Sequence, residues 1–115
     1  FDPVAYGLER IERTAEFEVG GTFRTWPEVR MVAGAGDGLQ VTSNVTNEAI
    51  ALDYDFNGGE AVIIDCATQS VLINDVDSRD VVTLGSDFFS LYPGVSSLAF
   101  TGCSYFEVRF SERWL

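Results

Sequence analysis

Apolar and polar residues alternate along most of this chain, which is the pattern of β-strands that bury one face. The segment 49–56 shows the pattern most clearly, because its larger apolar residues fall on one face and its alanines and aspartates on the other. The residues of the apolar face are Ile50, Leu52, Tyr54 and Phe56. We therefore expect these four side chains to lie in a core and the aspartates to face water.

Similar segments recur along the rest of the chain and are separated by turns rich in Gly, Asn and Asp. The predicted strands cover residues 14–19, 28–32, 39–43, 49–56, 61–64, 71–74, 81–84, 97–100 and 105–110. Between two of them, Asn57-Gly58-Gly59 supplies the positive φ angles that a tight reversal needs. No long helical pattern intervenes, so the sequence predicts an all-β fold, an antiparallel β-sandwich or barrel.

The length of 115 residues suits one domain with a substantial core. Residues 1–13 are charged and irregular, and we interpret them as a linker or lead-in from a missing N-terminal domain. Residues 14–115 would then form the sandwich domain. Because the chain begins with Phe1 rather than Met, we expect it to be part of a longer protein.

The charge of the chain argues against two classes of partner. Its net charge is −11, and all seven basic residues are arginine. Such a surface repels nucleic-acid phosphates and anionic lipid headgroups, so we expect neither nucleic acid nor membrane as a partner. No apolar run approaches the roughly 20 residues that a membrane span needs.

The residue types offer little for catalysis. The chain has no histidine, which removes the commonest general base and metal ligand and excludes a Ser-His-Asp or Cys-His arrangement within it. Cys66 and Cys103 lie in or beside apolar strands, where two buried reduced thiols or one disulfide would both fit. We predict that the protein is not an enzyme and that it holds no cofactor and no metal.

Three polar motifs have simpler interpretations than a site. The segment 74–80 is rich in aspartate, but it lacks the central Gly and distal Glu of a calcium loop, so we interpret it as a polar hairpin turn. Asp53 and Asp55 lie on one face of a single strand and fit a solvated surface better than a pair of catalytic carboxylates. Asn44-Val45-Thr46 matches a glycosylation acceptor, and we treat it as a chance match.

Aromatic residues are the candidate contacts for a ligand or partner. Trp26, Tyr92 and Trp114 could form a sugar-stacking platform or a protein interface, and packing within the core is the alternative. Tyr105 belongs to the same set. Periodicity places Tyr54 on the apolar face, which counts against a role in binding.

A series of short motifs runs along the chain in a recognisable order. They are Asp2-Pro3 before Tyr6, Gly21-Thr22, Trp26-Pro27, Gly59-Glu60 through Asp65, Phe88-Phe89-Ser90-Leu91-Tyr92-Pro93-Gly94, and Arg113-Trp114-Leu115. Their order and spacing resemble the C-terminal domain of the siphophage distal tail protein family. Ser96 departs from the family pattern, which often has Asn there, although both residues can hydrogen-bond a turn backbone.

The resemblance implies a jelly-roll sandwich, galectin-like or similar to a carbohydrate-binding module. It also implies structural roles for the motif residues that shape turns and strand ends. These are Gly21, Thr22, Pro27, Gly59, Asp65, Pro93 and Gly94.

The same resemblance implies a structural part of a phage or prophage tail tip. The C-terminal domain would dock neighbouring tail or receptor-binding proteins, and a separate N-terminal domain would build a hexameric ring. The virion would assemble in the bacterial cytoplasm. The alternative is a carbohydrate-binding module that contacts the polysaccharide of the host cell wall.

Overall fold

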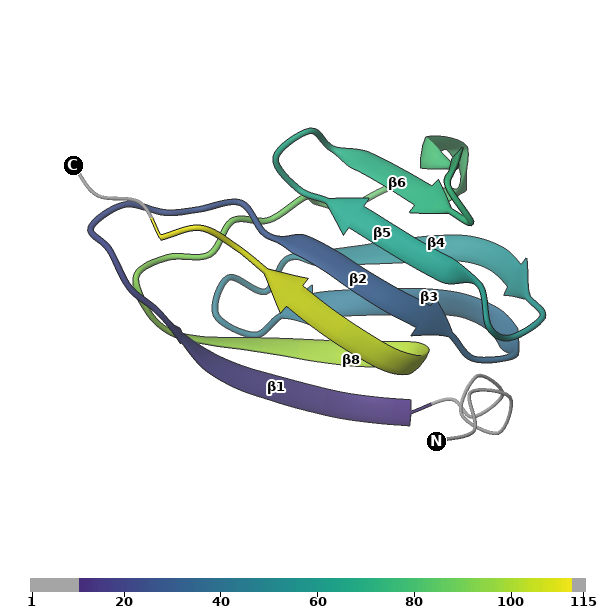
Figure 1. Ribbon diagram of the computed structural model, residues 1–115, viewed down its shortest axis with the longest axis horizontal. Helices are drawn as coiled ribbons and strands as arrows, with labels where there is room; N and C mark the ends of the chain where they lie inside the picture. The colour runs from purple at the N-terminus through teal and green to yellow at the C-terminus, as the bar shows by residue number, and fades with distance from the viewer. Residues whose placement is uncertain (1–10, 113–115) are drawn as a thin grey trace.

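One long strand connects the two layers of this fold. In the computed structural model, which describes residues 11–112, β8 (Gly94–Arg109) bends midway and belongs to both layers. Figure 1 shows β8 running beside β1, turning at one end of the molecule and returning beside β2. The hydrogen-bonded sheet therefore curls over itself to form an antiparallel β-sandwich, as the sequence predicts.

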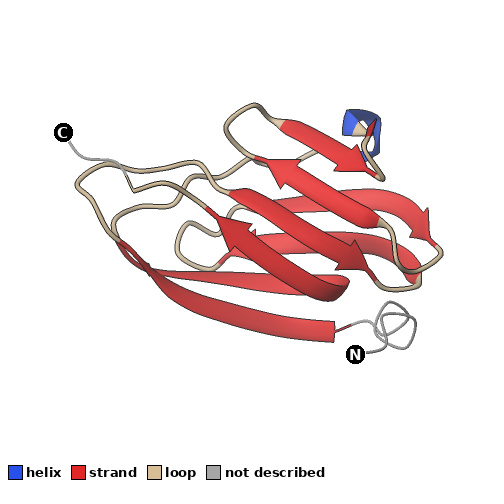
Figure 2. Cartoon of the chain, in the orientation of Figure 1, coloured by secondary structure: helices blue, strands red, loops and turns tan. Residues whose placement is uncertain are grey.

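The strands form two groups, and every pair of neighbours is antiparallel. In the first group the order is β1-β8-β3-β4, and in the second it is β8-β2-β5-β6-β7. The bounds of the other elements are Ile11–Val19 for β1, Glu28–Ala33 for β2, Gly36–Ser43 for β3, Ala49–Phe56 for β4, Ala61–Asp65 for β5, Ser70–Ile73 for β6, Val76–Asp77 for β7 and Arg79–Val81 for the 3-10 turn η1. Figure 2 shows this short turn beside strands that make up most of the described chain. Within that part of the chain, no helix is long and apolar enough to cross a membrane.

The core lies between the two layers and is built from alternate residues of their strands. On β2, Val29 and Met31 are buried while Arg30 is half-exposed, which confirms the predicted alternation. The two arms of β8 contact each other through Phe100 and Phe106, whose rings stack with centroids 4.0 Å apart. Burying side chains of this size stabilises the fold by about 1.5–3 kcal/mol each, so the core rather than the turns dominates stability.

Gly102 forms the corner at which β8 changes layers. Its φ of 96° lies in the region that favours glycine. The pairing with β1 skips Gly102 and the pairing with β2 skips Ser104, so each arm has one unpaired residue at the bend. Such bulges let one strand serve two layers. Two strands predicted separately, 97–100 and 105–110, are therefore parts of one strand.

The predicted strand 81–84 is wrong. Residues 79–81 form the turn η1, and the segment that follows makes only an isolated bridge between Val82 and Leu52. Its apolar residues suggested a strand, but they cross the edge of β4 as a loop. β4 spans residues 49–56 as predicted, whereas β1 and β3 each begin three residues earlier than predicted, so that residues 11–13, predicted to be a linker, belong to β1.

The expectation that Tyr54 is buried is also wrong, because its side chain is 40% exposed. An irregularity in the pairing of β3 with β4 lies between Asp37 and Leu39, where Gly38 has a φ of 76°. Asp53 and Tyr54 of β4 lie opposite this one residue of β3, and the centroid of the Tyr54 ring lies 4.8 Å from that of Phe56.

The hairpin turn predicted over residues 74–80 is confirmed only at residues 74–75, because residues 76–77 form β7 and residues 79–81 form η1. Ile73 pairs with Val76 across a two-residue turn, and both turn residues, Asn74 and Asp75, have positive φ. That geometry is typical of a tight hairpin whose twist matches its strands. No group of three or more metal-ligating side chains gathers here or elsewhere in residues 11–112.

Candidate functional site

The structure brings together the chain segments that carry two of the predicted contact residues. Thr25 and Leu91 pair through two backbone hydrogen bonds of 2.8 and 2.7 Å. Trp26 is half-buried against the core, and Tyr92 is 47% exposed. Trp114, the third predicted contact, lies outside the described residues.

A shallow hollow of about 320 Å³ lies beside Trp26. Arg109, the cationic residue in its lining, donates a 2.6 Å hydrogen bond to the carboxylate of Glu107. This hydrogen bond raises the pKa of the Arg109 guanidinium. Glu28, another lining residue, accepts a hydrogen bond from Arg30. Arg109 and Glu28 are thus paired within the protein, while Asp65, which also lines the hollow, accepts hydrogen bonds from the backbone of the turn that follows it.

Both ends of one family-motif segment, Gly59 to Asp65, hold turns in place. The Glu60 carboxylate is buried and accepts hydrogen bonds of 2.8 Å from the backbone N–H groups of Asn57 and Gly58. Asp65 ends β5 and accepts a 3.0 Å hydrogen bond from the backbone N–H of Ala67. Both acidic residues therefore have a structural role, which is to stabilise the turns beside them.

The other motif residues also lie at turns and strand ends. The carbonyl of Pro27 accepts a 3.0 Å hydrogen bond from Cys66, and Gly94 has a φ of 113° at the start of β8. Gly21 and Gly59 have φ values of 94° and 93°. Thr22 and Pro93 lie exposed in loops.

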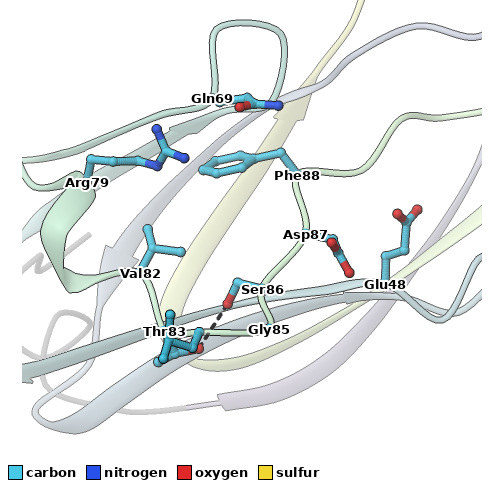
Figure 3. A pocket seen from close by; sticks show the side chains of 10 residues that line it. Glu48, Gln69, Arg79, Val82, Thr83, Gly85, Ser86, Asp87 and Phe88 are labelled. Carbon is cyan, nitrogen blue, oxygen red and sulfur yellow. Dashed lines mark hydrogen bonds between the residues drawn. The ribbon is translucent and has the colours of Figure 1, made fainter.

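A second hollow, with a volume of about 560 Å³, lies beside the loop 82–88. Figure 3 shows its lining: Arg79 and Phe88 face each other, Gln69 lies above them, and Glu48 and Asp87 lie together at the other side. These residues come from η1, from the turn before β6, from the loop itself and from the residue before β4. The sequence analysis did not identify this site, because it predicted a strand over residues 81–84.

The loop 82–88 is attached to the edge of β4 by hydrogen bonds. The backbone N–H groups of Thr83 and Asp87 donate to the carbonyls of Ala51 and Ala49, both at 2.9 Å. The Ser86 hydroxyl accepts a 3.1 Å hydrogen bond from the backbone N–H of Ala51. The same hydroxyl lies 2.9 Å from the Thr83 hydroxyl (Figure 3). The loop thus has a fixed shape and covers an edge that would otherwise expose unpaired backbone groups.

Leu84 is at the tip of this loop and is fully exposed. The tip is a tight turn, in which Ser86 donates a 3.2 Å backbone hydrogen bond to Thr83 and Gly85 has a φ of 86°. The exposed Leu84 side chain belongs to the lining of the hollow. The cluster of Gly, Ser and Asp at residues 85–87 was the one sequence signal for a loop here.

The lining of this hollow offers groups that can bind a ligand or a partner. The Arg79 guanidinium stacks over the Phe88 ring at 5.1 Å, and the carboxylates of Glu48 and Asp87 offer acceptors. Neither cysteine lines the hollow. Cys66 and Cys103 are both buried and free, in agreement with two reduced thiols, and burial raises the pKa of the Cys66 thiol to about 12. A thiol with that pKa stays protonated at neutral pH and is a poor nucleophile.

Comparisons with known proteins agree with the resemblance seen in the sequence. A family described as "Siphovirus-type tail component, C-terminal domain" matches residues 20–114. Among solved structures, the Dit protein (gp 19.1) of phage SPP1 superposes with a TM-score of 0.61 at 17% sequence identity. That protein is described as a paradigm of the hub adsorption apparatus in phages that infect Gram-positive bacteria. No curated protein matches.

The match to the phage SPP1 protein covers 83% of this chain and 47% of that one, so the chain spans about half the length of its structural relative. At this level of identity the superposition supports the fold. The family match rests on the sequence and covers most of the chain.

Proposed function

This chain belongs to the siphovirus-type tail components as their C-terminal domain, and from that premise we propose that it docks neighbouring proteins at the tip of a phage tail. The role is structural and needs no chemical step. The docked proteins would be other tail components or receptor-binding proteins. The parent protein would carry an N-terminal domain that forms a hexameric ring, and it would assemble into virions in the bacterial cytoplasm.

The observation that carries this proposal is the loop 82–88. Its hydrogen bonds to β4 fix its shape, yet its tip holds Leu84 fully in solvent. Burying a leucine at an interface contributes about 1.5–3 kcal/mol, and a loop that is already ordered loses little conformational entropy on binding. Leu84 and the adjoining hollow therefore provide an apolar anchor beside groups that can bond a polar rim.

A ring would strengthen such a contact. Six copies of the loop on one hexamer would present six equivalent anchors to a symmetric partner. Binding at one anchor raises the effective concentration at the others, so a modest single contact suffices for stable assembly.

Replacing Leu84 with serine in the full-length protein tests the proposal. The phage carrying Leu84→Ser should form tails that lose the neighbouring protein, and its infectious titre should fall by tenfold or more for a loss of about 1.5–3 kcal/mol per contact. Val95→Ser is the matched control, because Val95 is also exposed, at 70%, and lies at the start of β8 away from the loop. Mass spectrometry of purified tails would measure their composition. Tails of normal composition and titre with Leu84→Ser would contradict the proposal.

The lining of the hollow also favours carbohydrate binding as a second candidate function. Planar polar groups on Gln69, Glu48 and Asp87 can bond sugar hydroxyls. Titration of the full-length protein with polysaccharide fragments from the host wall would test it. NMR shifts confined to this hollow would support the candidate, and unchanged spectra at millimolar fragment would exclude it.

A further inference from the structure

Strand β1 is a free edge of the sandwich. In the described part of the chain β1 pairs only with β8, along nine residues. The edge of β4 is different, because the loop 82–88 bonds to it. The outermost strand of the second layer, β7, has only two residues. Within residues 11–112 the other edges are thus covered or short, whereas no segment pairs with the outer side of β1 (Figure 1).

The outward face of this edge carries exposed carboxylates, while Arg13, the arginine of the same strand, falls by alternation on the face of Ala15 and Phe17. Glu16 and Glu18 are exposed and lie opposite Ser97 and Val95 of β8. The ion pairs found within residues 11–112 lie elsewhere, on β2 and on the second arm of β8. A basic side chain on an added strand would reach these carboxylates from the open side.

The inward face of the same edge is incompletely covered. Ala15 and Phe17 point toward the core and remain half-buried. An added strand would place alternate residues over them, and apolar side chains there would extend the core. The edge therefore suits a strand in which basic and apolar residues alternate.

We propose that β1 accepts an extended basic segment of another protein by β-strand addition. A second copy of this chain is a poor occupant, because each copy carries a net charge of −11 and both β1 strands would bring carboxylates to the new pair. A segment with Lys or Arg at alternate positions gains both the backbone hydrogen bonds and the charge pairing. This site is separate from the loop 82–88, so its test is independent of the proposal made for that loop.

A synthetic peptide tests the proposal on the full-length protein. The probe is a nine-residue peptide of alternating lysine and valine, capped at both ends. Hydrogen exchange measured by mass spectrometry should show slower exchange in residues 11–19 when the peptide is bound. The variants Glu16→Gln and Glu18→Gln should each weaken binding roughly two- to fivefold, as expected for one cross-strand charge pair. A control, Asp53→Asn on the exposed face of β4, should leave binding unchanged.

Methylated peptides separate strand addition from simple charge attraction. One peptide is N-methylated at its odd positions and another at its even positions, so that each loses the hydrogen bonds of one edge. Strand addition requires that one of the two binds and that the other does not, whereas attraction of charges alone would treat both alike. Equal binding of the two peptides, or protection that maps outside β1, would overturn the proposal.

Discussion

At the scale of single residues, Glu60 shows how a family motif can be structural. Its carboxylate reaches back over the turn between β4 and β5 and satisfies two backbone N–H groups that have no strand partner. The backbone of the same residue bonds to Ala33 at the end of β2, where Ala33 donates to the Glu60 carbonyl at 2.9 Å. Glu60 therefore stabilises the connection that leads from β4 in one layer to β5 in the other.

Replacing Glu60 with alanine should destabilise the domain by about 2 kcal/mol, because hydrogen bonds to a charged group contribute roughly 1.5–3 kcal/mol and water can replace part of them. Glu60→Gln keeps one acceptor oxygen and should cost less. Urea unfolding would measure both. Asp53→Ala, which removes an exposed carboxylate from β4, should stay within about 0.5 kcal/mol of the wild type. A loss for Glu60→Ala no larger than that of the control would refute this role.

Cys66 makes the stability depend on alkaline pH. Burial raises the pKa of its thiol from 9.0 to about 12, and a hydrogen bond from the Phe89 backbone acts in the opposite direction. Above pH 9 the unfolded chain releases this proton while the folded protein keeps it. The stability contributed by the neutral thiol is therefore complete below pH 9 and is lost as the pH rises toward 12.

The expected loss is about 1.4 kcal/mol per pH unit over that window. Urea unfolding from pH 8 to 11 would measure it. The variant Cys66→Ala should be less stable at pH 8, but it should lack this part of the slope. Identical slopes for the two proteins would show that the Cys66 thiol does not titrate in this way. The native protein should also resist thiol reagents at pH 8 and react fully once unfolded.

At the scale of elements, the bend of β8 is the decisive feature. Without it the two arms would form one flat strand, and the layers would not face each other. The φ of Gly102 is positive, and glycine adopts such a value most easily because it has no Cβ atom. The bend therefore depends on glycine at this position.

Gly102→Ala should destabilise the domain by about 1–3 kcal/mol, the usual cost of forcing a residue with a side chain into such a conformation. Thr101→Ala, at the exposed neighbouring position, should cost much less. Thermal unfolding followed by circular dichroism would compare them. Equal melting temperatures for the two variants would show that the corner tolerates a side chain.

Most strands could be predicted from period-two alternation, because each has one face on the core and one in water. The pattern fails where burial is set by something other than alternation. Val81 and Val82 pack against the core from a loop rather than from a strand, and Tyr54 is exposed beside a bulge at which β4 has one residue more than β3. The continuity of β8 depends on a bend at Gly102 that looks like a turn in the sequence.

At the scale of the whole molecule, the family was predictable from the order of the motifs, and the family match over residues 20–114 confirms it. The candidate docking surface could not be predicted from the sequence. It depends on hydrogen bonds between the loop 82–88 and β4, more than thirty residues away, and on the exposure that follows for Leu84. The jelly-roll and galectin-like descriptions, the hexameric ring and the domain boundary near residue 13 stay predictions.

The central claim is that this domain docks a neighbouring tail protein through the loop 82–88. Electron cryomicroscopy of the assembled tail tip tests it most directly, because it shows which surface of each copy is covered. We predict that another protein packs against Leu84 and the hollow beside Arg79 and Phe88. A tail tip in which Leu84 faces bulk solvent in every copy, with no neighbouring chain in contact with the loop, would contradict the claim.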